Sequence, residues 1–350
     1  MSLMKVSIFC NLEGNRSIDR YADELAANFS RGIEAQKIWF PSHGGLPGKL
    51  FDRHLRYLWR ARARQGDVNI IVSEGYAFLL LAIDPRRTVV VCHDLHPLMA
   101  PPGRDKIYRL RFRLNLRLLH RARAVITVSD ATRSYLLKHC SLLKPERVIT
   151  VHSGLGTQWQ PSSDAAQRKA TRESYGLSED DKIVLHVANA NWYKNFSAVA
   201  EAFSLVKEPN AHLVKVGRLS QRDQQLICDL GIEKRVIHIS QADDQELLRL
   251  YHIADVLVFP SLHEGFGWPP LEAMACGCPV VASNRPAIPE ICGEACLYVD
   301  PLDARGIAGA IERVLREPGL RSQLAAAGLA QARKYSWKQA AARIVEIAQS

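Results

Sequence analysis

Short segments rich in Val, Ile and Leu recur along the whole chain and alternate with stretches that have helical spacing. Segments of about four to eight such residues indicate strands buried on both faces, as in parallel sheets that helices cover on either side. In the first half the predicted strands are Val6–Cys10, Asn69–Ser73, Thr88–His93, Ala124–Ser129 and Val148–His152. In the second half they are Ile183–Ala188, His212–Gly217, Val236–Ser240, Val256–Pro260, Pro279–Ala282 and Leu297–Asp300. The predicted fold class is α/β with doubly wound, Rossmann-like parallel sheets.

The helices and one break in the pattern divide the chain. The predicted helices are Ile18–Phe29, Leu50–Arg64, Arg104–Arg121, Ala131–His139, Asp303–Arg316, Leu320–Lys334 and Trp337–Ala348. Gly154–Asp181 is polar and short of strand signal, so we predict it to be a linker. A chain of 350 residues is long enough for two domains. Two doubly wound domains facing across a cleft would hold a ligand at the carboxyl ends of their strands.

The composition excludes several classes of protein. With 47% hydrophobic and 23% charged residues, the chain matches soluble globular proteins. Tyr76–Ile83 is the best candidate for a membrane span, and it falls far short of the roughly 20 residues that a transmembrane helix needs. The apolar segment Lys5–Cys10 is too brief for a signal peptide. We therefore expect a cytoplasmic protein, with peripheral contact at the inner membrane face as an alternative.

The eight cysteines contain no C-x-x-C pair. The spacings of Cys276/Cys278 and Cys292/Cys296 could serve a metal, but no histidine stands close to either pair in the sequence. Most of the cysteines lie in apolar strands, where a free cysteine behaves as a small hydrophobic residue. We expect reduced thiols in the protein core.

The net charge of +10 is unevenly distributed. Residues 1–153 contain 25 Lys/Arg against 13 Asp/Glu, a net of +12, and the remainder contains 21 against 23, a net of −2. The whole basic excess therefore belongs to the N-terminal half. Such an asymmetry suggests an anionic surface or partner for that half.

The most basic stretch is Arg104–Arg123, which is predicted to be helical. Its basic residues include Lys106, Arg109, Arg111, Arg113, Arg117 and Arg121, and its apolar residues at helical spacing are Ile107, Leu110, Leu114 and Leu118. The favoured interpretation is a solvated arginine face over an ordinary core stripe. The alternative is attraction to an anionic membrane leaflet, where each basic residue contributes about 1 kcal/mol. No aromatic residues interleave with a basic patch, so nucleic acid is not an expected partner.

One stretch, Pro260–Gly277, stands out from the rest of the chain and reads PSLHEGFGWPPLEAMACG. It begins where a predicted strand ends, and the two glycines around Phe266 allow backbone amides to approach a ligand closely. Two prolines then indicate a helix start, whose free amides and positive dipole end suit an anion such as phosphate. Glu264 in the glycine loop and Glu272, expected on the first turn of the helix, could accept hydrogen bonds from sugar or ribose hydroxyls. For Glu272 alone, simple compensation of the helix dipole is the favoured interpretation.

Three further residues lie where predicted strands end. His93 follows a strand of the first half, where a structural role and a role in a binding crevice are equally plausible. Lys194 follows the loop after Ile183–Ala188 and could reach a diphosphate as a point charge. Arg218, after Gly217, is a second cation in an equivalent position. Either cation alone is a weak signal, since lysine and arginine are common on any surface.

Cofactor motifs are absent from the sequence. The first βα turn, residues 11–16, has Gly14 as its only glycine instead of G-x-G-x-x-G, which argues against a dinucleotide-binding fold. The chain also has no Asp-x-Asp motif and no histidine-rich cluster. We expect neither a catalytic metal nor another cofactor.

The stretch Asp255–Pro301 resembles the donor-binding domain of retaining family 4 glycosyltransferases (group 1 glycosyl transferases), which have the GT-B fold. Within it, residues 263–290 read HEGFGWPPLEAMACGCPVVASNRPAIPE, and the stretch ends in YVDP. Its E-x7-E pair is Glu264 and Glu272. A weaker resemblance covers nearly the whole chain. It includes Ser17–Leu25 as the first helix, His93–Asp94 as the crevice histidine, and Val187–Asn195 as the phosphate-binding loop.

The resemblance implies transfer of a hexose from a nucleotide sugar to a saccharide or glycolipid acceptor with retention of configuration. It implies that Glu264 contacts hydroxyls of the donor sugar, Glu272 the ribose, and His93 the donor sugar from the other domain. Lys194 would neutralise the diphosphate leaving group, where charge grows in the transition state. The donor-binding residues would be Gly14, Arg218, Glu264, Gly265, Phe266, Gly267 and Glu272.

The resemblance also implies a division of the chain. Residues 1–160 would form the acceptor-side domain, residues 161–335 the donor-binding domain, and residues 336–350 a helix that returns to the first domain. The sequence WPPLEAMACG is most similar to mannosyl-transferring members, so GDP-mannose is the expected donor.

Two alternatives remain at this point. The family often has arginine where Asn189 stands, and the first loop contains only Gly14; both departures suit a catalytically silent scaffold that binds a nucleotide sugar. Glycosidase action by Glu264 and Glu272 is disfavoured, because a carboxylate pair must flank a glycosidic bond in an open site, at a separation of roughly 5–9.5 Å.

Overall fold

The computed structural model describes residues 3–10, 16–39, 47–99 and 106–350. The chain forms two compact units: unit 1 comprises Met1–Gly154 and Tyr335–Ser350, and unit 2 comprises Leu155–Lys334. The divisions predicted from the sequence lie after residues 160 and 335, and those between the compact units lie after residues 154 and 334. Within the described residues, no helix is both long enough and apolar enough to cross a bilayer.

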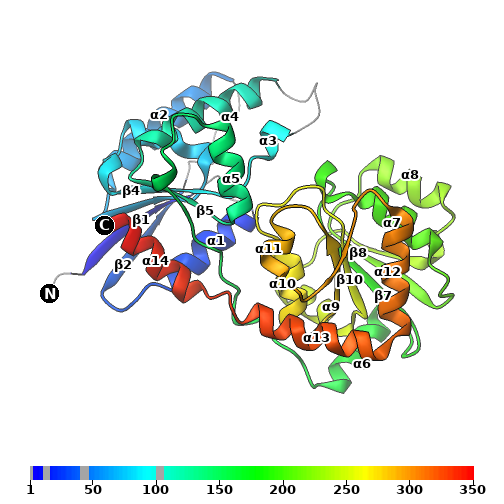
Figure 1. The fold of residues 1–350 in the computed structure, drawn as a ribbon. Helices are drawn as coiled ribbons and strands as arrows, with labels where there is room; N and C mark the ends of the chain where they lie inside the picture. The colour runs from blue at the N-terminus through cyan, green and yellow to red at the C-terminus, as the bar shows by residue number, and fades with distance from the viewer. Residues whose placement is uncertain (1–2, 11–15, 40–46, 100–105) are drawn as a thin grey trace. The chain divides into compact units, whose positions relative to one another are not determined.

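Unit 1 is built on a parallel sheet in the order β2-β1-β3-β4-β5-β6 (Figure 1). The strands are β1 (Met4–Phe9), β2 (Ile33–Ile38), β3 (Val68–Ile71), β4 (Thr88–Cys92), β5 (Ala124–Thr127) and β6 (Val148–Thr150). Five of them match predicted strands to within a few residues. The sequence analysis missed β2, because this edge strand reads IEAQKI and is only partly buried. The chain order reverses between β1 and β3, and such a switch point is where doubly wound sheets bind ligands.

Helices cover both faces of this sheet. They are α1 (Arg16–Ala27), α2 (Pro47–Ala63), α3 (His96–Met99), α4 (Lys106–Leu118), α5 (Asp130–His139) and α14 (Trp337–Gln349), with a short 3-10 segment η1 (Glu74–Leu81). The last helix, α14, packs on α1, β3 and β4 (red in Figure 1). Its Trp337 ring makes an edge contact with Tyr21 of α1, with the centroids 5.1 Å apart.

The favoured interpretation of α4 is wrong. Its buried residues are Phe112 and Leu116, and the helix packs through this side against η1. Ile107, Leu110 and Leu114 are 73%, 59% and 50% exposed. At about 100° per residue these three lie roughly opposite the buried side. The predicted core stripe is therefore an exposed apolar stripe among arginines.

Unit 2 contains a second parallel sheet, in the order β12-β11-β10-β7-β8-β9. Its strands are β7 (Lys182–Val187), β8 (Ala211–Val216), β9 (Val236–Ile239), β10 (Val256–Phe259), β11 (Val280–Ser283) and β12 (Leu297–Val299). All six were predicted. This is the strand order of dinucleotide-binding Rossmann sheets, and its switch point lies between β7 and β10.

The helices of unit 2 lie on both faces of this sheet. They are α6 (Ala165–Ser174), α7 (Phe196–Leu205), α8 (Gln221–Asp229), α9 (Asp244–Ile253), α10 (Trp268–Ala275), α11 (Ile288–Cys292), α12 (Ala304–Arg316) and α13 (Pro318–Ala332). The core consists largely of strand residues and the inner faces of α7 and α12. Seven of the eight cysteines are buried and all are free, as predicted; Cys228 is exposed.

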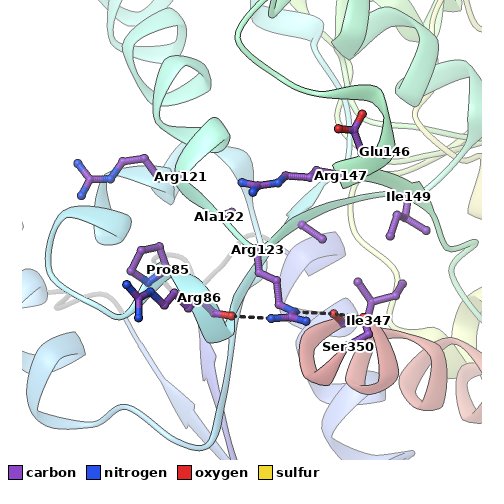
Figure 2. A pocket seen from close by; sticks show the side chains of 11 residues that line it. Pro85, Arg86, Arg121, Ala122, Arg123, Glu146, Arg147, Ile149, Ile347 and Ser350 are labelled. Carbon is purple, nitrogen blue, oxygen red and sulfur yellow. Dashed lines mark hydrogen bonds between the residues drawn. The ribbon is translucent and has the colours of Figure 1, made fainter.

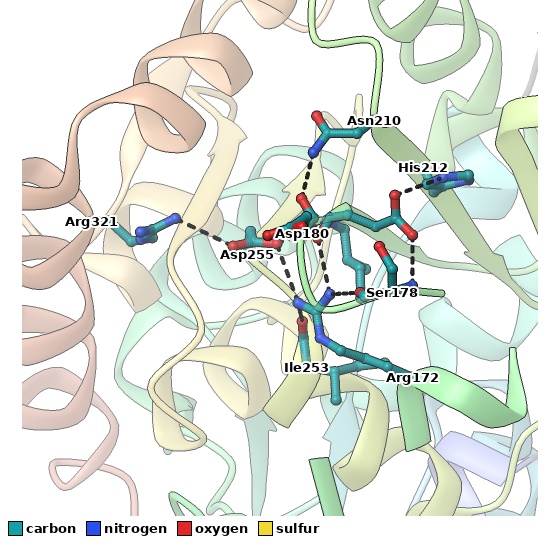
Figure 3. Close-up of polar contacts among 10 residues, drawn as sticks. Arg172, Ser178, Asp180, Asn210, His212, Ile253, Asp255 and Arg321 are labelled. Atoms are coloured by element: carbon teal, nitrogen blue, oxygen red, sulfur yellow. Dashed lines mark hydrogen bonds and ion pairs between the residues drawn. The ribbon is translucent and has the colours of Figure 1, made fainter. Parts of the chain in front are cut away.

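The segment Gly154–Asp181 is not a linker, since it carries α6 and is held to the sheet of unit 2. Arg172 of α6 donates to the carbonyls of Ser178, Asp181 and Ile253 at 3.0, 2.9 and 3.1 Å (Figure 3). It also lies 3.7 Å from Asp255, which accepts from the Ile183 amide at 2.9 Å. Polar residues of this segment, which suggested a linker, take part in these anchoring contacts.

We predict that Arg172→Ala destabilises the protein by about 3 kcal/mol, because it leaves three carbonyls without their donor and removes one of the two arginines beside the largely buried Asp255 carboxylate, which keeps Arg321 at 3.2 Å. The matched control is Arg313→Ala, which breaks an ion pair whose side chains are 57% and 49% exposed and costs less than about 1 kcal/mol. Urea unfolding measures both. Equal losses for the two variants would contradict the anchoring role of Arg172.

Candidate functional site

The switch point of unit 2 brings Lys194 and Glu264 together. Lys194 ends the turn after β7, and Glu264 follows β10, the neighbouring strand. The Lys194 Nζ lies 2.7 Å from Glu264 Oε1, and the two side chains are only 17% and 8% exposed. The ammonium also lies 5.1 Å from the centroid of the Phe259 ring. A shielded, hydrogen-bonded ion pair thus occupies the position where such sheets bind ligands.

Three loops are fastened around this pair. The Leu262 amide donates to the Tyr193 carbonyl at 2.7 Å, which joins the β10 loop to the β7 loop. The Asn195 side chain donates to the carbonyls of Pro260 and Pro301 at 3.0 and 2.7 Å, and so includes the loop after β12. Asn195 has a left-handed backbone with φ +57°, a conformation that asparagine tolerates better than most residues. The site therefore has a preorganised framework.

The glycine loop is shaped by close packing as well as by backbone freedom. Gly267 has φ +104°, and a β-carbon there would lie 2.7 Å from the Ile288 Cδ1 atom. Phe266, next to Gly265, is buried, and its ring makes an edge contact with Trp268 at 6.2 Å. Helix α10 starts directly after Gly267, with two prolines in its first turn. The helix N-terminus predicted from the sequence is therefore present.

Glu272 differs from its prediction, because it lies beyond the first turn of α10. The first turn contains no acidic residue, and Glu272 is 3% exposed. Its Oε2 atom accepts a hydrogen bond from the Tyr251 hydroxyl at 2.9 Å. Because the effect of the helix dipole falls off beyond the first turn, Glu272 is poorly placed to compensate it, and its hydrogen bond to Tyr251 gives it another structural role. Tyr251 is a partner that the sequence analysis did not identify.

The end of β8 holds two cations of different kinds. Arg218 is exposed, and its side chain makes no hydrogen bond or ion pair within the described residues. Lys215, three residues earlier, is 1% exposed. Its Nζ donates to the carbonyls of Ala188, Val216 (2.7 Å) and Gly217 (3.3 Å). Burial lowers the pKa of Lys215 from 10.5 to about 8.

This buried lysine links the β7 and β8 loops beneath Asn189, which is exposed. Gly217 approaches the same Ala188 carbonyl, and a β-carbon on it would lie 2.2 Å from that oxygen. The sequence analysis missed Lys215, although a lysine inside an otherwise apolar predicted strand was a visible signal. A positive charge is thus bound to the carbonyl of the residue just before Asn189, the position where the family often has arginine.

A second buried polar residue, His186 of β7, accompanies Lys215. Its Nδ1 lies 2.9 Å from the Val258 carbonyl, and within the described part of the chain its Nε2 has no partner. Burial and the nearby Lys215 lower the pKa of His186 to about 3. The imidazole is therefore neutral at physiological pH, and Nδ1 carries the proton that it donates to the carbonyl.

In unit 1, His93 lies directly after β4. Its ring Nε2 donates to the Val72 carbonyl at 2.8 Å, and the ring makes an edge contact with Tyr21 at 4.8 Å. Burial lowers the pKa of His93, so the ring is neutral at pH 7. The Nδ1 atom is then an acceptor, available to a hydroxyl group. Gly14, the other predicted residue of unit 1, lies outside the described residues.

Glu74, at the switch point of unit 1, is a residue that sequence reasoning missed. It follows β3, it is buried, and its Oε2 accepts from the His93 amide at 3.1 Å. Burial, reinforced by the charge of Asp94, raises the pKa of Glu74 to about 8. Asp94 itself pairs with His96 Nδ1 at 2.7 Å. In the described residues, no group of three or more His, Cys, Asp or Glu side chains could hold a metal.

We predict that Lys215 makes the stability of the protein depend on pH. Its pKa is lower in the folded state than in the unfolded state, so its buried charge is a cost that is complete below pH 8 and disappears above about pH 10.5. The stability of the wild type relative to Lys215→Met should thus rise by about 3 kcal/mol over this interval. Urea unfolding across the interval measures it, with Lys207→Met at an exposed lysine as the control. A flat difference would contradict a charged, buried Lys215.

Two family models match consecutive parts of the chain. The model "Glycosyltransferase Family 4" matches residues 4–159, and the model "Glycosyl transferases group 1" matches residues 167–331. The Escherichia coli serotype-specific mannosyltransferase WbdA is 30% identical over 286 residues, which cover 78% of this chain and 35% of WbdA. The O-antigen chain mannosyltransferase B of the same organism is 29% identical, over 72% of this chain and 65% of that protein. The chain thus spans about a third of WbdA.

Solved structures show the same fold over the whole chain. HepE of Anabaena, solved in complex with UDP-glucose, matches with a TM-score of 0.83 at 18% identity and 98% coverage of both chains. WaaG, a glycosyltransferase involved in lipopolysaccharide biosynthesis, matches with a TM-score of 0.76 at 18% identity, over 99% of this chain and 100% of that chain. Both Rossmann-like units therefore have the topology of the GT-B fold. With both units matched in sequence and in structure, the chain belongs to the family 4 (group 1) glycosyltransferases.

Proposed function

We propose that the chain transfers a hexose from a nucleotide sugar to a saccharide or lipid-linked acceptor with retention of configuration. The observation that carries this proposal is the shielded Lys194–Glu264 pair at the switch point of unit 2. It combines a cation for a diphosphate with a carboxylate for sugar hydroxyls, in a family of glycosyltransferases. A glycosidase pair is not favoured, because Glu264 is paired with a lysine and Glu272 is buried against Tyr251.

The proposed roles follow from the chemistry of each group. Lys194 turns from Glu264 to the diphosphate as negative charge grows on the leaving group. Glu264, with the loop Gly265–Gly267, then accepts hydrogen bonds from the donor sugar. Glu272, held by Tyr251, accepts from the ribose, and Arg218 provides a second, exposed cation. His93 offers its neutral Nδ1 as an acceptor for a sugar hydroxyl.

Retention requires that the new bond forms on the face from which the old one breaks. We propose that the acceptor oxygen bonds to the sugar carbon while the bond from that carbon to the phosphate oxygen breaks. The acceptor proton passes to the leaving phosphate, so no dedicated protein base is needed. Lys194 supplies the positive charge, and we propose that the reaction needs no metal or other cofactor. A turnover rate that is unchanged when a metal chelator is added would support this.

The proposed donor is GDP-mannose, and the proposed acceptor is a growing polysaccharide or a lipid-linked saccharide. The support is the similarity to a serotype-specific mannosyltransferase and to an O-antigen chain mannosyltransferase. The competing donor is UDP-glucose, which is bound in the HepE structure. A thermal-shift screen of GDP- and UDP-sugars, followed by turnover with the stabilising donor and analysis of the product anomer, tests donor and stereochemistry together. An inverted anomer would reject the retaining mechanism.

The alternative is a silent scaffold that binds a nucleotide sugar without transferring it. Its support is Asn189, where the family often has arginine. Lys215 weakens that support, because its buried charge lies beneath the same loop. Stoichiometric donor binding without hydrolysis or transfer, over a wide acceptor panel, would favour the scaffold.

We predict that Lys194→Met lowers kcat by roughly 10²–10³-fold with a smaller change in KM, because its charge matters most in the transition state. Arg218→Met should mainly raise KM, since its exposed side chain would contact the bound donor similarly throughout the reaction. Lys207→Met is the control at a distant, exposed lysine. Steady-state kinetics with the cognate donor measures all three. Loss of affinity alone in Lys194→Met would contradict its role at the leaving group.

We also propose that unit 1 binds the cytoplasmic face of an anionic inner membrane. Helix α4 exposes Ile107, Leu110 and Leu114 beside arginines on the same helix, notably Arg113 and Arg117. A helix with exposed apolar side chains and flanking cations can insert the former shallowly and attract anionic lipids with the latter. The basic excess of residues 1–153 acts in the same direction.

We predict that Ile107→Ser, Leu110→Ser and Leu114→Ser together lower binding to anionic vesicles about tenfold, at ~0.5 kcal/mol for each partly inserted side chain. The control replaces Leu142 and Leu205 with serine; these leucines lie outside α4 and are 58% and 45% exposed. Vesicle co-sedimentation at two salt concentrations measures both. Equal binding to neutral and anionic vesicles, insensitive to salt, would reject the membrane proposal.

A further inference from the structure

A pocket lies in unit 1, at the edge of the sheet where the strands begin. It has a volume of about 530 Å³ and is lined by the residues just before β4, around the start of β5 and at the start of β6 (Figure 2). The end of α14 closes one side through Ile347 and Ser350. Its volume is within the range of about 300–1,000 Å³ that small-molecule sites occupy.

Arginine is the dominant residue type of this pocket. The charged lining residues are Arg86, Arg121, Arg123, Arg147 and Glu146. The loops that carry them are the short connections that start β4, β5 and β6, which lie side by side in the sheet. Parallel pairing therefore brings together cations that are far apart in the sequence. No aromatic side chain is among the described lining residues, so the pocket offers no stacking surface for a nucleobase.

Arg123 forms the fixed floor of the pocket. Its Nε donates to the Ile347 carbonyl and its Nη1 to the Arg86 carbonyl, each at 3.1 Å (Figure 2). Its own amide donates to the carbonyls of Pro85 and Thr88 at 2.9 and 3.0 Å. The guanidinium thus joins α14 to the β4 loop, and both of its recorded partners are carbonyls, which leave its charge uncompensated.

The other three arginines are uncompensated as well. Within the described residues, the side chains of Arg86, Arg121 and Arg147 form no hydrogen bond or ion pair. Glu146 likewise forms no ion pair there, and the nearby Asp84 is paired with Arg87 at 3.3 Å. Among the side chains that line the pocket, four are positively charged and one, Glu146, is negatively charged. Such a concentration of guanidinium groups, without internal partners, raises the local concentration of anions.

We propose that this pocket binds a phosphate-bearing anion with two or more negative charges, such as a phosphomonoester or a diphosphate group. Guanidinium groups present paired N–H donors that match phosphate oxygens in a bidentate manner. This excess of positively charged side chains favours a multiply charged anion over a single carboxylate. The ligand could be a free phosphate compound or the headgroup of a phosphate-bearing lipid, and both share this chemistry.

The pocket is separate from the candidate donor site. His93 follows the carboxyl end of β4, whereas Arg86 precedes its amino end. The five residues of β4 span about 16 Å, at roughly 3.3 Å per residue. The proposal therefore does not depend on the glycosyl-transfer function, and it would stand if that function failed.

The test compares Arg86→Gln/Arg147→Gln with Arg31→Gln/Arg62→Gln, which removes two exposed arginines of unit 1 outside the pocket. All chains also carry Lys194→Met and Arg218→Met, which remove both cations of the proposed donor site, so that any remaining phosphate binding there is the same in every chain. Arg123 is left intact because it fastens α14. In one arm, calorimetry titrates inorganic pyrophosphate; in the other, vesicles of phosphatidylcholine with and without phosphatidate are co-sedimented.

We expect the pocket variant to lose at least tenfold in affinity in one or both arms, while the control changes less than about threefold. Loss with pyrophosphate alone identifies a soluble ligand, and loss with phosphatidate vesicles identifies a lipid headgroup. Arg121→Glu, which reverses a charge, should abolish binding in the same arm. Equal behaviour of the pocket and control variants in both arms would overturn the proposal.

Discussion

Parallel pairing of the strands is the constraint on which the rest of the structure depends. In a parallel sheet all carboxyl ends meet at one edge, so residues separated by 70 positions, such as Lys194 and Glu264, can form an ion pair at 2.7 Å. The strand order decides which ends are neighbours. In unit 2 the order reverses between β7 and β10, and these two strands carry the pair. The same rule places Glu74 after β3, at the switch point of unit 1, with His93 beside it.

Where the sequence carries a strong periodic signal, the fold was predictable from it. Continuous apolar strands located eleven of the twelve strands, and the twelfth, β2, was missed because an edge strand needs no apolar segment. Helix α4 shows a different limit. Its sequence has two apolar sides, one with Phe112 and Leu116 and the other with Ile107 and Leu114. Periodicity alone cannot decide which of the two sides is buried in the folded unit. That choice depends on η1, which packs against the first of them.

The buried charges could be predicted only in part, because their environment is set by tertiary packing. Lys215 was visible as a lysine within an apolar strand, yet its three carbonyl partners come from the ends of β7 and β8. Glu74 had no comparable signal, since its raised pKa depends on burial and on Asp94. Glu272 shows the opposite error: counting from the prolines placed it near the helix start, whereas packing made it a buried acceptor for Tyr251.

The glycine loop is supported from behind by a strained residue. Ala287 has φ +74° and ψ −46° and is 1% exposed; this backbone is close to that of the rare γ-turn, and such sparsely populated conformations cost on the order of 1–3 kcal/mol. Its strain is maintained because its carbonyl accepts from the Ile291 amide at 3.0 Å, which starts α11 and sets Ile288 against Gly267. A β-carbon at Gly267 would lie 2.7 Å from that isoleucine. Glycine is therefore needed there for two independent reasons, and strain beside a candidate site is consistent with a loop held in one shape for its ligand.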